Sequence, residues 1–376
     1  MARTTSEHVP FVDLQPSNAR IKDRVLRAIA EMIDRGDFIG GRAVAEFEER
    51  FAAYVGRRHA VGVSSGLDAL RLALLASGLK PGGGVIVPAA TFAATVEAVI
   101  QAGGIPVVVD VSDDDYTLDV ERTAQALRSD VTHILPVHLY GQMADMKALS
   151  RMAAGGGLEI VEDACQAHGA QRDGLPAGGA GRAAAFSFYP AKNLGAMGDA
   201  GALVTDDDEL AALTRAFRSH GETRKYHHDH QGYTARLDTV QALVLLEKLP
   251  LLEEWNAERR AAAAFYGDAL SGLELLRLPR EAQGSESSWH LYVVRTPQPE
   301  ELATFLRRRG IHTGRHYPEP VHLASAYRGL GHAAGDFPVS EALARESLSL
   351  PLYPGISESQ LSWVCDAVHD YVRSVE

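Results

Sequence analysis

The length, composition and charge of this chain restrict the functions it can have. Its 376 residues suffice for two domains, and a content of 46% hydrophobic and 23% charged residues is typical of a globular protein. No apolar run reaches the roughly 18 residues of a membrane-spanning helix, so we expect no membrane association. The formal net charge of -12 disfavours a nucleic-acid partner, because phosphate backbones are bound by clustered Lys and Arg.

The N-terminus, the cysteines and the histidines indicate a cytoplasmic protein without a metal site. The first residues, MARTTSEHVP, contain no apolar segment of the kind that a secretory signal requires. Two cysteines, Cys165 and Cys365, are too few for a disulfide scaffold or a structural zinc site. The histidine-rich run HHDH at 227–230 lies in a polar loop, and its closely spaced rings cannot all face one ion. We therefore expect reduced thiols and no metal.

Strands and helices alternate over most of the chain. Short and often β-branched runs predict strands at 59–63, 85–87, 106–110, 133–137, 158–162, 184–187 and 201–205. Helical patterns lie between them at 67–77, 95–102, 146–153 and 209–217. This alternation is typical of a mostly parallel sheet that helices cover on both faces. We expect one large α/β domain over residues 13–248.

The pattern changes after Leu249. A long Ala- and Glu-rich helix is expected at 251–270, followed by a strand at 290–296 and helices at 299–309 and 357–373. This mixture predicts a smaller C-terminal α+β domain over residues 249–376. Residues 1–12 are expected to pack near it.

Two glycine-containing segments are candidate anion sites. Ser64-Ser65-Gly66 separates the strand ending at Val63 from the helix that follows, and free N-H groups at such a helix start bind anions. The same residues also serve as ordinary caps. The run GAGRAA at 179–184 fits the loose dinucleotide-binding pattern, but it precedes a strand where that fingerprint must follow one. A dinucleotide site is therefore disfavoured.

Two further segments supply chemistry at strand ends. Asp163, Gln166 and His168 follow the strand at 158–162, although a capping Asp and a core His remain an alternative. Lys192 follows Ser187 by five residues, within a run of small and apolar residues. A desolvated lysine loses its proton easily and attacks aldehydes. An anion site, a carboxylate and an imine-forming lysine, in this order, are the protein groups that pyridoxal phosphate (PLP) requires.

The chain resembles the DegT/DnrJ/EryC1/StrS family of nucleotide-sugar aminotransferases, which are fold-type-I enzymes dependent on PLP. The resemblance extends over nearly the whole chain, and its motifs are VPFVDL (9–14), GDFIGG (36–41), HAVGVSSGLDAL (59–70), PAATFAAT (88–95), PVHLYGQMADM (136–146), EDACQAHGA (162–170), SFYPAKNLGAMGDAG (187–201), RLDTVQA (236–242), HYPEPVH (316–322) and LSLPLYPG (348–355). It implies a large α/β domain with a mostly parallel sheet between helices and a smaller C-terminal domain.

The resemblance also implies roles for single residues near the cofactor. Lys192 would form the imine with PLP and move the proton between substrate and cofactor. Asp163 would keep the pyridine nitrogen protonated, Gln166 would lie near the ring, and Phe92 would stack on its face. In the family, both subunits of a homodimer build each active site, so a homodimer with shared sites is implied.

The phosphate site is implied with two departures from the family pattern. Gly66, Leu67 and Ser187 would bind the phosphate, the first two through backbone N-H groups, but many relatives have Thr at the position of Leu67. Many relatives also read G-x-N-x-R where this chain has GYTAR at 232–236. Thr234, from the partner subunit, is shorter than the family Asn, and its contact with the phosphate is an open expectation.

Three more residues are candidates for the substrate site. Arg236 would clamp a carboxylate of the amino donor or, with equal weight, would pair with Asp238. His316 and Tyr317 match a family motif and would line the sugar pocket, although a structural turn before Pro318 is an alternative.

The implied reaction is transfer of an amino group from L-glutamate to a ketone of a nucleotide-linked deoxysugar, with dTDP as the expected nucleotide. The sequence GLDAL at 66–70 resembles the branch that aminates C3, which favours C3 over C4. Such enzymes serve deoxyaminosugar and antibiotic biosynthesis. Amination of a keto-cyclitol, as in aminoglycoside pathways, is the alternative within the family. A non-catalytic descendant that keeps the fold as a binding protein is the alternative outside enzymes, and Lys192 argues against it.

Overall fold

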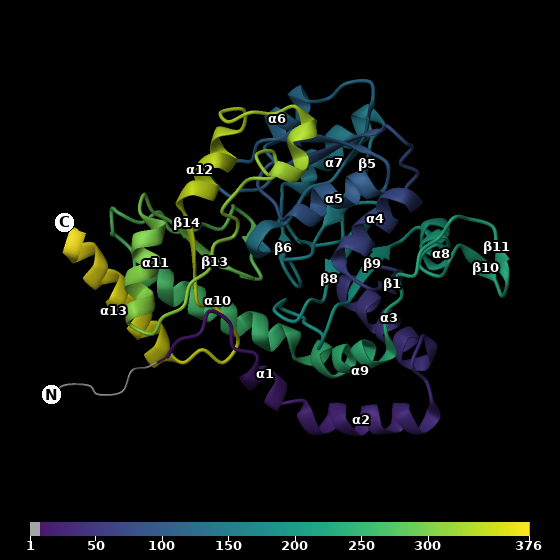
Figure 1. Cartoon of the computed structure of the whole chain (residues 1–376), viewed down its shortest axis with the longest axis horizontal. Helices are drawn as coiled ribbons and strands as arrows, with labels where there is room; N and C mark the ends of the chain where they lie inside the picture. The colour runs from purple at the N-terminus through teal and green to yellow at the C-terminus, as the bar shows by residue number, and fades with distance from the viewer. Residues whose placement is uncertain (1–7, 376) are drawn as a thin grey trace.

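A seven-stranded sheet forms the centre of the molecule (Figure 1). The computed structural model describes residues 8–375. The strands lie in the order β1-β9-β8-β5-β4-β2-β3, and β9 runs antiparallel to both its neighbours while the other pairs are parallel. Their bounds are β1 (His59–Val63), β2 (Gly84–Pro88), β3 (Ile105–Val109), β4 (Val131–Ile134), β5 (Glu159–Asp163), β8 (Ala183–Ser187) and β9 (Gly201–Thr205). The expected mostly parallel sheet is confirmed.

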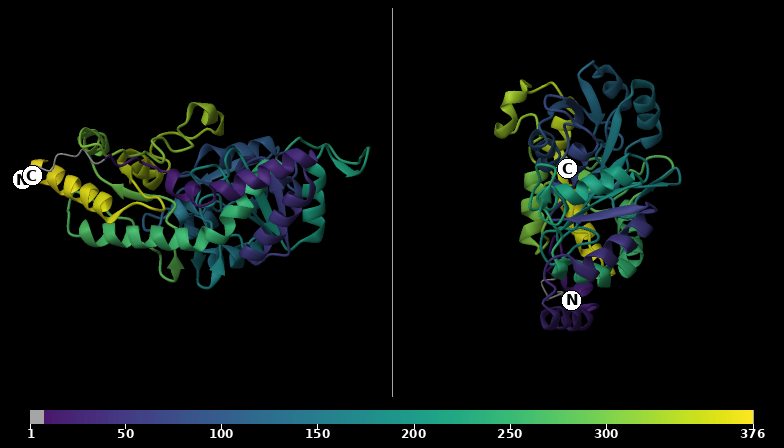
Figure 2. Two further views of the ribbon diagram at one scale, coloured as in Figure 1. Left: turned by 90° about the horizontal axis from the view of Figure 1, so that it is seen from below. Right: turned by 90° about the vertical axis from the view of Figure 1, so that its right-hand side faces the viewer.

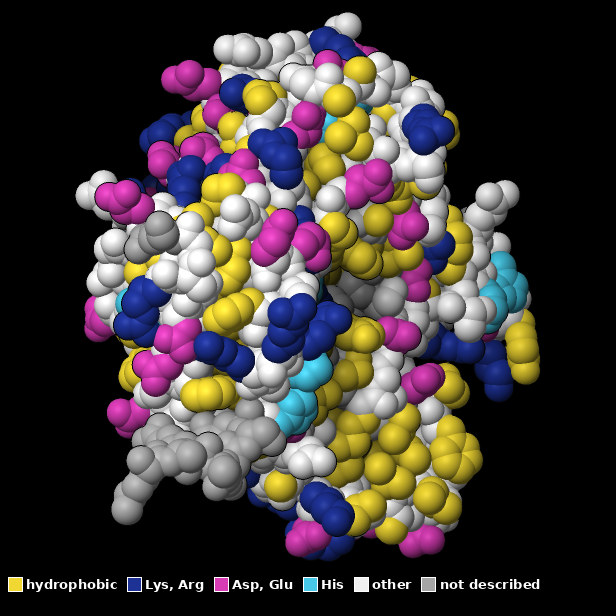
Figure 3. Space-filling model, turned by 60° about the vertical axis from the view of Figure 1, so that its left-hand side comes forward, with side chains coloured by type: hydrophobic (Ala, Val, Ile, Leu, Met, Phe, Trp, Pro, Cys, Tyr) yellow, Lys and Arg dark blue, Asp and Glu magenta, His cyan; other side chains and the backbone are white. Residues whose placement is uncertain are grey.

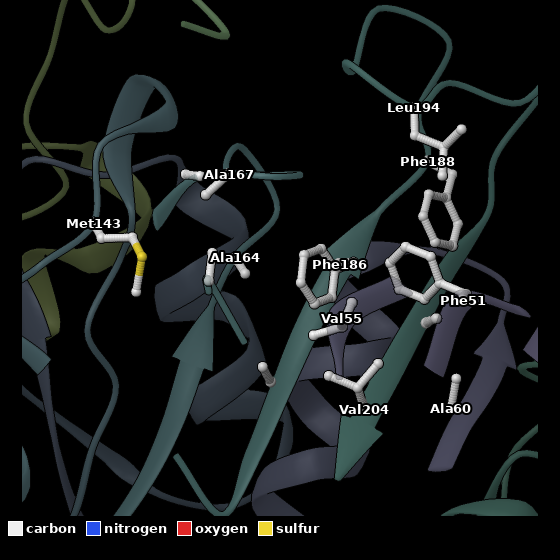
Figure 4. Packing of buried hydrophobic residues seen from close by; sticks show 14 of the residues in the cluster. Phe51, Val55, Ala60, Met143, Ala164, Ala167, Phe186, Phe188, Leu194 and Val204 are labelled. Carbon is white, nitrogen blue, oxygen red and sulfur yellow. The ribbon is translucent and has the colours of Figure 1, made fainter. Parts of the chain in front are cut away.

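Helices bury both faces of this sheet. One face is covered by α3 (Gly41–Val55), α7 (Met146–Gly156) and α9 (Thr239–Lys248), the other by α4 (Gly66–Ala76), α5 (Ala93–Gln101) and α8 (Asp208–Phe217). We call the cluster under α3, α7 and α9 the first core and the cluster under α4, α5 and α8 the second core. Because side chains alternate along a strand, Ala184 and Phe186 of β8 lie in the first core, whereas Ala183 and Ala185 lie in the second. Figure 4 shows Phe51 of α3 against Phe186, with ring centroids 5.1 Å apart.

Smaller elements surround this core. Helices α1 (Gln15–Ala19) and α2 (Lys22–Arg35) lie along one edge, where Ile21 and Val25 pack against Val244 of α9. The hairpin β10 (Glu222–Arg224) and β11 (His227–His228) projects from the body of the molecule (Figures 1 and 2). The remaining short elements are α6 (Val120–Gln125), η1 (Leu139–Gly141), η2 (Leu249–Leu251), β6 (Gln171–Arg172), β7 (Leu175–Pro176) and β12 (Ser285–Glu286).

The C-terminal part has a core of its own. The long helix α10 (Leu252–Ala269) packs with α11 (Pro299–Arg308), α13 (Glu358–Val375) and the antiparallel pair β13 (Tyr292–Arg295) and β14 (Ser347–Leu350). Val9 joins this core and pairs with Ile311. The domain boundary at 248/249 stays a prediction, and residues 1–7 of the expected N-terminal contact lie outside the described residues.

One C-terminal segment packs on the sheet domain instead. Helix α12 (Pro338–Glu346) and η3 (Ser325–Leu330) lie near α4 and α5, where Val321, Tyr327 and Phe337 enter the second core. Buried Asp110 accepts hydrogen bonds from the Val339 and Ser340 N-H groups at 3.0 and 2.9 Å, which fixes the start of α12. Across the described residues, no helix combines the length and hydropathy needed to cross a membrane.

Candidate active site

The carboxyl ends of the parallel strands meet at one edge of the sheet, where a cavity of about 360 Å³ opens. Side chains after β1, β2, β5 and β8 line it, together with residues of the C-terminal part. Nine of the eleven predicted site residues lie in its wall, namely Gly66, Leu67, Phe92, Asp163, Gln166, Ser187, Lys192, His316 and Tyr317. Segments far apart in the sequence are therefore brought together as expected.

The start of α4 forms an anion cradle in this wall. Ser65 caps the helix, and its Oγ accepts a hydrogen bond from the Asp68 N-H at 3.1 Å. The N-H groups of Gly66 and Leu67 have no acceptor within residues 8–375. A Cβ at Gly66 would lie 2.8 Å from Cys165 Sγ and from Ser187 Cβ, so only glycine leaves the cradle open. The cradle fits a phosphate.

Asp163 is a buried carboxylate that faces the same cavity. Its Oδ2 accepts a hydrogen bond from Thr95 Oγ1 at 2.8 Å and its Oδ1 accepts one from the Cys165 N-H at 3.2 Å. No cationic side chain within residues 8–375 forms an ion pair with it, although its residue exposure is only 5%. A buried carboxylate needs a cation to stay ionised at low cost, and a protonated ring nitrogen in the cavity supplies one.

Gln166 is held in one orientation beside Asp163. Its Oε1 accepts a hydrogen bond from the Tyr140 N-H at 2.8 Å, and its Nε2 donates to Tyr317 Oη at 2.9 Å. Tyr317 also lies against Phe92, with ring centroids 5.3 Å apart. The Phe92 side chain is 54% exposed, an unusual position for a large apolar ring unless a flat ligand or a second chain covers it.

The neighbouring residue Glu162 fixes the end of β5. Glu162 belongs to β5, and its side chain is fully buried. It accepts hydrogen bonds from His138 Nε2 at 2.8 Å and from the N-H groups of Gly178, Ala180 and Gly181. Burial opposes ionisation, but these hydrogen bonds outweigh it and hold the pKa of Glu162 below its usual value. The position of Asp163, one residue on, is thereby set.

His168 does not line the cavity. Its ring lies between Phe186 and Phe188, with centroids 5.3 and 5.7 Å away, and neither ring nitrogen has a partner within residues 8–375. Burial lowers the pKa of His168 to about 3, so the ring is neutral at pH 7. The core alternative is correct for this histidine.

Lys192 lies in the turn after β8 and faces the cavity. Burial lowers the pKa of its amine, against the opposing influence of Cys165 and Asp163. The turn is anchored by Asn193, whose Nδ2 donates to Asn256 Oδ1 at 2.9 Å, and by buried Lys248, whose Nζ donates to the Gly195 carbonyl at 2.7 Å. A firmly held lysine that loses its proton readily has the properties of an imine-forming nucleophile.

Residues 19–369 match the DegT/DnrJ/EryC1/StrS aminotransferase family. The chain belongs to this family. It is 44% identical over 375 residues, all of this chain and 99% of the relative, to the dTDP-3-amino-3,4,6-trideoxy-alpha-D-glucose transaminase of Streptomyces venezuelae. A pleiotropic regulatory protein of Geobacillus stearothermophilus is 40% identical over 97% of this chain and 99% of its own.

The fold agrees with the family throughout. The structure of S. venezuelae DesV in complex with a ketimine intermediate superposes with a TM-score of 0.96 at 45% identity, covering 98% of this chain and 100% of that one. The chain is therefore a PLP-dependent aminotransferase of fold type I. The cradle at Gly66, the buried Asp163 and the turn at Lys192 fit this cofactor.

Two family positions lie outside the cavity of this subunit. Thr234 is exposed and lies within 3.2 Å of His220 Nε2. Arg236 pairs through its backbone with Val63, and no ion pair joins it to Asp238 among the described residues. Neither side chain lines the cavity of its own chain. The contact of Thr234 with the phosphate of the neighbouring subunit and the contact of Arg236 with a carboxylate of the amino donor both stay predictions.

Several wall residues were not predicted from the sequence. Thr95 supports Asp163, and the wall also contains Phe11, Arg259 and His290. One signal was available for Arg259, because Leu252, Asn256, Arg259, Ala263 and Tyr266 follow a helical spacing of three or four and are all buried. His316, which was predicted, is neutral at pH 7 because burial lowers its pKa to about 4.

Leu67 departs from the Thr of many relatives without closing the cradle. Its side chain packs against the second core, while its N-H remains at the start of α4.

No cluster of three or more His, Cys, Asp or Glu side chains suited to a metal ion occurs within residues 8–375.

Proposed function

We propose that this enzyme transfers an amino group from L-glutamate to the C3 ketone of a dTDP-linked deoxysugar. The observation that carries the proposal is the convergence of Lys192, Asp163 and the cradle at Gly66 in one cavity. The C3 position and the dTDP group rest on the name of the S. venezuelae relative and on the GLDAL sequence at 66–70. A C4 ketone and a keto-cyclitol are alternative acceptors that the assay below separates.

The cavity offers each group that holds the cofactor. The N-H groups of Gly66 and Leu67, with Ser187, would bind the phosphate, and Asp163 would keep a proton on the ring nitrogen. PLP, when bound, supplies an electron-withdrawing ring that stabilises negative charge on the carbon losing its proton. Phe92, which lines the cavity, would stack on one face of this ring.

Lys192 then acts as the base. Because burial lowers the pKa of its amine, Nζ is more often neutral than that of a surface lysine and can take up a proton. Once the amino group of L-glutamate has replaced Lys192 at the cofactor, the freed Nζ would take the proton from the carbon that carries this amino group and would return it to the cofactor carbon bonded to the same nitrogen. Asn193 and Lys248 keep the turn in place while this happens.

We also propose a homodimer whose active sites are shared. Apolar side chains that are 46–59% exposed gather around the cavity mouth and α2, namely Leu26, Ile33, Phe38, Ile39, Phe92, Tyr189 and Met197. Figure 3 shows hydrophobic side chains concentrated at the lower right of one face. A patch of this kind is typical of an interface between subunits. In such a dimer Thr234 and Arg236 would serve the partner's cavity.

The spectrum of the holoenzyme tests the reaction. We expect L-glutamate to convert the near-visible absorbance band of the bound cofactor to that of its amine form, and a ketoacid to reverse the change. Lys192→Ala must fail to complete this cycle. A regulatory protein without activity, as the name of the G. stearothermophilus relative raises, would show no conversion by any amino acid.

A panel of ketones identifies the acceptor. Amine-form enzyme is mixed with dTDP-linked 3-keto and 4-keto sugars and with a free keto-cyclitol, and recovery of the near-visible band is followed. The proposal expects the 3-keto nucleotide sugar to react with the highest kcat/KM. Preference for the free keto-cyclitol, or full amination by Lys192→Ala protein, would contradict it.

A further inference from the structure

Arg259 is a buried cation in the wall of the active-site cavity. It lies on α10, only 4% of the residue is exposed, and it contributes to the cavity lining. Its Nη1 donates to the carbonyl oxygens of Trp289, His290 and Leu352 at 3.3, 3.2 and 3.0 Å. These contacts hold the guanidinium in one place without neutralising it.

No carboxylate within residues 8–375 neutralises this charge. The adjacent Glu258 is engaged elsewhere, because its Oε2 accepts a hydrogen bond from the Gly355 N-H at 2.7 Å. Nε of Arg259 is buried without a partner, and Nη2 donates to no described residue. Burial lowers the pKa of Arg259 to about 10, so the side chain still carries its charge at pH 7. A buried and unpaired charge is costly, which favours an anionic ligand as its partner.

The other positively charged groups of the wall are already committed. Lys192 would hold the cofactor, and the cradle at the start of α4 would bind its phosphate. His290 and His316 are neutral at pH 7, because burial lowers the pKa of His290 well below its usual value and that of His316 to about 4. Among the wall residues that the structure describes, Arg259 is thus the one permanently charged cation left for a substrate.

We infer that Arg259 binds a carboxylate of the amino donor. A guanidinium fork matches a carboxylate, and its low exposure at the cavity wall suits a small dicarboxylate better than a bulky nucleotide. The inference rests on the proposed function, and it assigns one of the two carboxylates of L-glutamate to Arg259. Arg236 of the partner remains available for the other.

Binding of glutarate to the holoenzyme tests the inference without a reaction, because glutarate carries both carboxylates and no amino group. Isothermal titration calorimetry compares wild type with Arg259→Gln, Arg259→Lys and the control Arg260→Gln. Arg260 is the next residue on α10 and pairs with Glu286 at 3.1 Å outside the cavity. We expect Arg259→Gln to weaken glutarate binding by about 10- to 100-fold, the range of a charge-assisted hydrogen bond. Arg259→Lys should recover part of the loss, and Arg260→Gln should bind within about twofold of wild type.

The two half-reactions separate binding from support of the fold. Loss of a donor contact raises KM for L-glutamate and leaves KM for the ketone substrate within about threefold. Three results for these variants would overturn the inference. The first is that Arg259→Gln lowers kcat/KM equally in both half-reactions, and the second is that it leaves glutarate affinity unchanged. The third is that Arg236→Gln weakens glutarate binding while Arg259→Gln does not. Weaker binding of dTDP alone would overturn it too.

Wild-type protein provides a test that needs no variant. Glutarate should bind at least tenfold more tightly than glutaramide, which has the same chain length and no charge. If wild type binds neither, the inference is wrong. If no ketone is aminated but glutarate still binds through Arg259, the proposed acceptor fails and the donor site stands.

Discussion

Replacing Gly201 by alanine tests how closely the sheet must approach the phosphate cradle. Gly201 begins β9 and pairs with Val63 on one side and Ser187 on the other. A Cβ at this position would lie 2.4 Å from the carbonyl carbon and oxygen of Ser65 and 2.8 Å from the Gly66 nitrogen. These are backbone atoms at the start of α4, so no side chain can rotate away to make room.

The size of the effect follows from these distances. Ordinary van der Waals contact begins at 3.4 Å, so the start of α4 must move by about 1 Å (3.4 minus 2.4). Overpacking of this kind costs about 1–3 kcal/mol, and we expect a value near the upper end because the contact is with backbone. A site that binds through fixed N-H groups tolerates only about 0.5 Å of displacement. PLP affinity should therefore fall at least about tenfold, or roughly 1.4 kcal/mol.

Gly267→Ala is the matched control. Gly267 lies within α10 and an added Cβ would meet no atom within 4 Å. Alanine at this position should stabilise the protein by about 1 kcal/mol through helix propensity. Urea unfolding of the cofactor-free proteins measures stability, and titration of the absorbance with PLP measures affinity. If Gly201→Ala unfolds within about 0.5 kcal/mol of wild type and binds PLP equally well, the reasoning about the cradle is wrong.

Three further predictions concern the charges around the site. Asp163→Asn keeps the shape and removes the charge, so kcat/KM should fall at least about 100-fold, and near-normal turnover would refute the role of the carboxylate. Thr95→Val removes a buried 2.8 Å hydrogen bond to Asp163 and should lower the free energy of unfolding at pH 7 by about 2 kcal/mol; an unchanged urea midpoint would contradict this. Burial lowers the pKa of Lys248 to about 8. Between pH 8 and roughly 10.4, the pKa of a free lysine, the unfolded chain therefore binds more protons than the folded one. As a result, this lysine makes the free energy of unfolding rise with pH over that range by up to about 3 kcal/mol. Lys248→Met should flatten that rise in unfolding curves measured from pH 7 to 10, and equal slopes for the two proteins would exclude the shift.

Periodicity predicts the sheet well because its strands are buried on both faces. The expected strand at 59–63 matches β1 and that at 201–205 matches β9, residue for residue. Continuous apolar runs of this kind are distinctive. No element is expected from sequence over 22–55, yet α2 and α3 lie there. The apolar residues of α2 at 25, 26, 29, 32 and 33 do follow a helical spacing, so the signal for this helix was present in the sequence, although Leu26 and Ile33 on this stripe are exposed.

At the site, too, some residues were predictable from the sequence and others were not. Asp163 and Lys192 were predictable, because Asp163 ends one strand and Lys192 follows another, and the carboxyl ends of these strands meet at one edge of the sheet. The direction of a side chain within a turn was not. Gln166 faces the cavity while His168, two residues later, enters the aromatic core, and only the packing of Phe186 and Phe188 decides this.

One helix supports both the reactive turn and the inferred donor site. Asn256 and Arg259 are three residues apart on α10 and therefore lie on the same face of the helix. Asn256 Oδ1 accepts from Asn193, next to Lys192, while Arg259 donates to the carbonyl of His290, whose Nδ1 lies 3.1 Å from Asn193 Oδ1. On the inferred role of Arg259, the carboxylate of the donor and the base that removes its proton are therefore positioned by the same rigid element. This arrangement keeps the amino-bearing carbon in register with Nζ, because any shift of α10 moves both groups together.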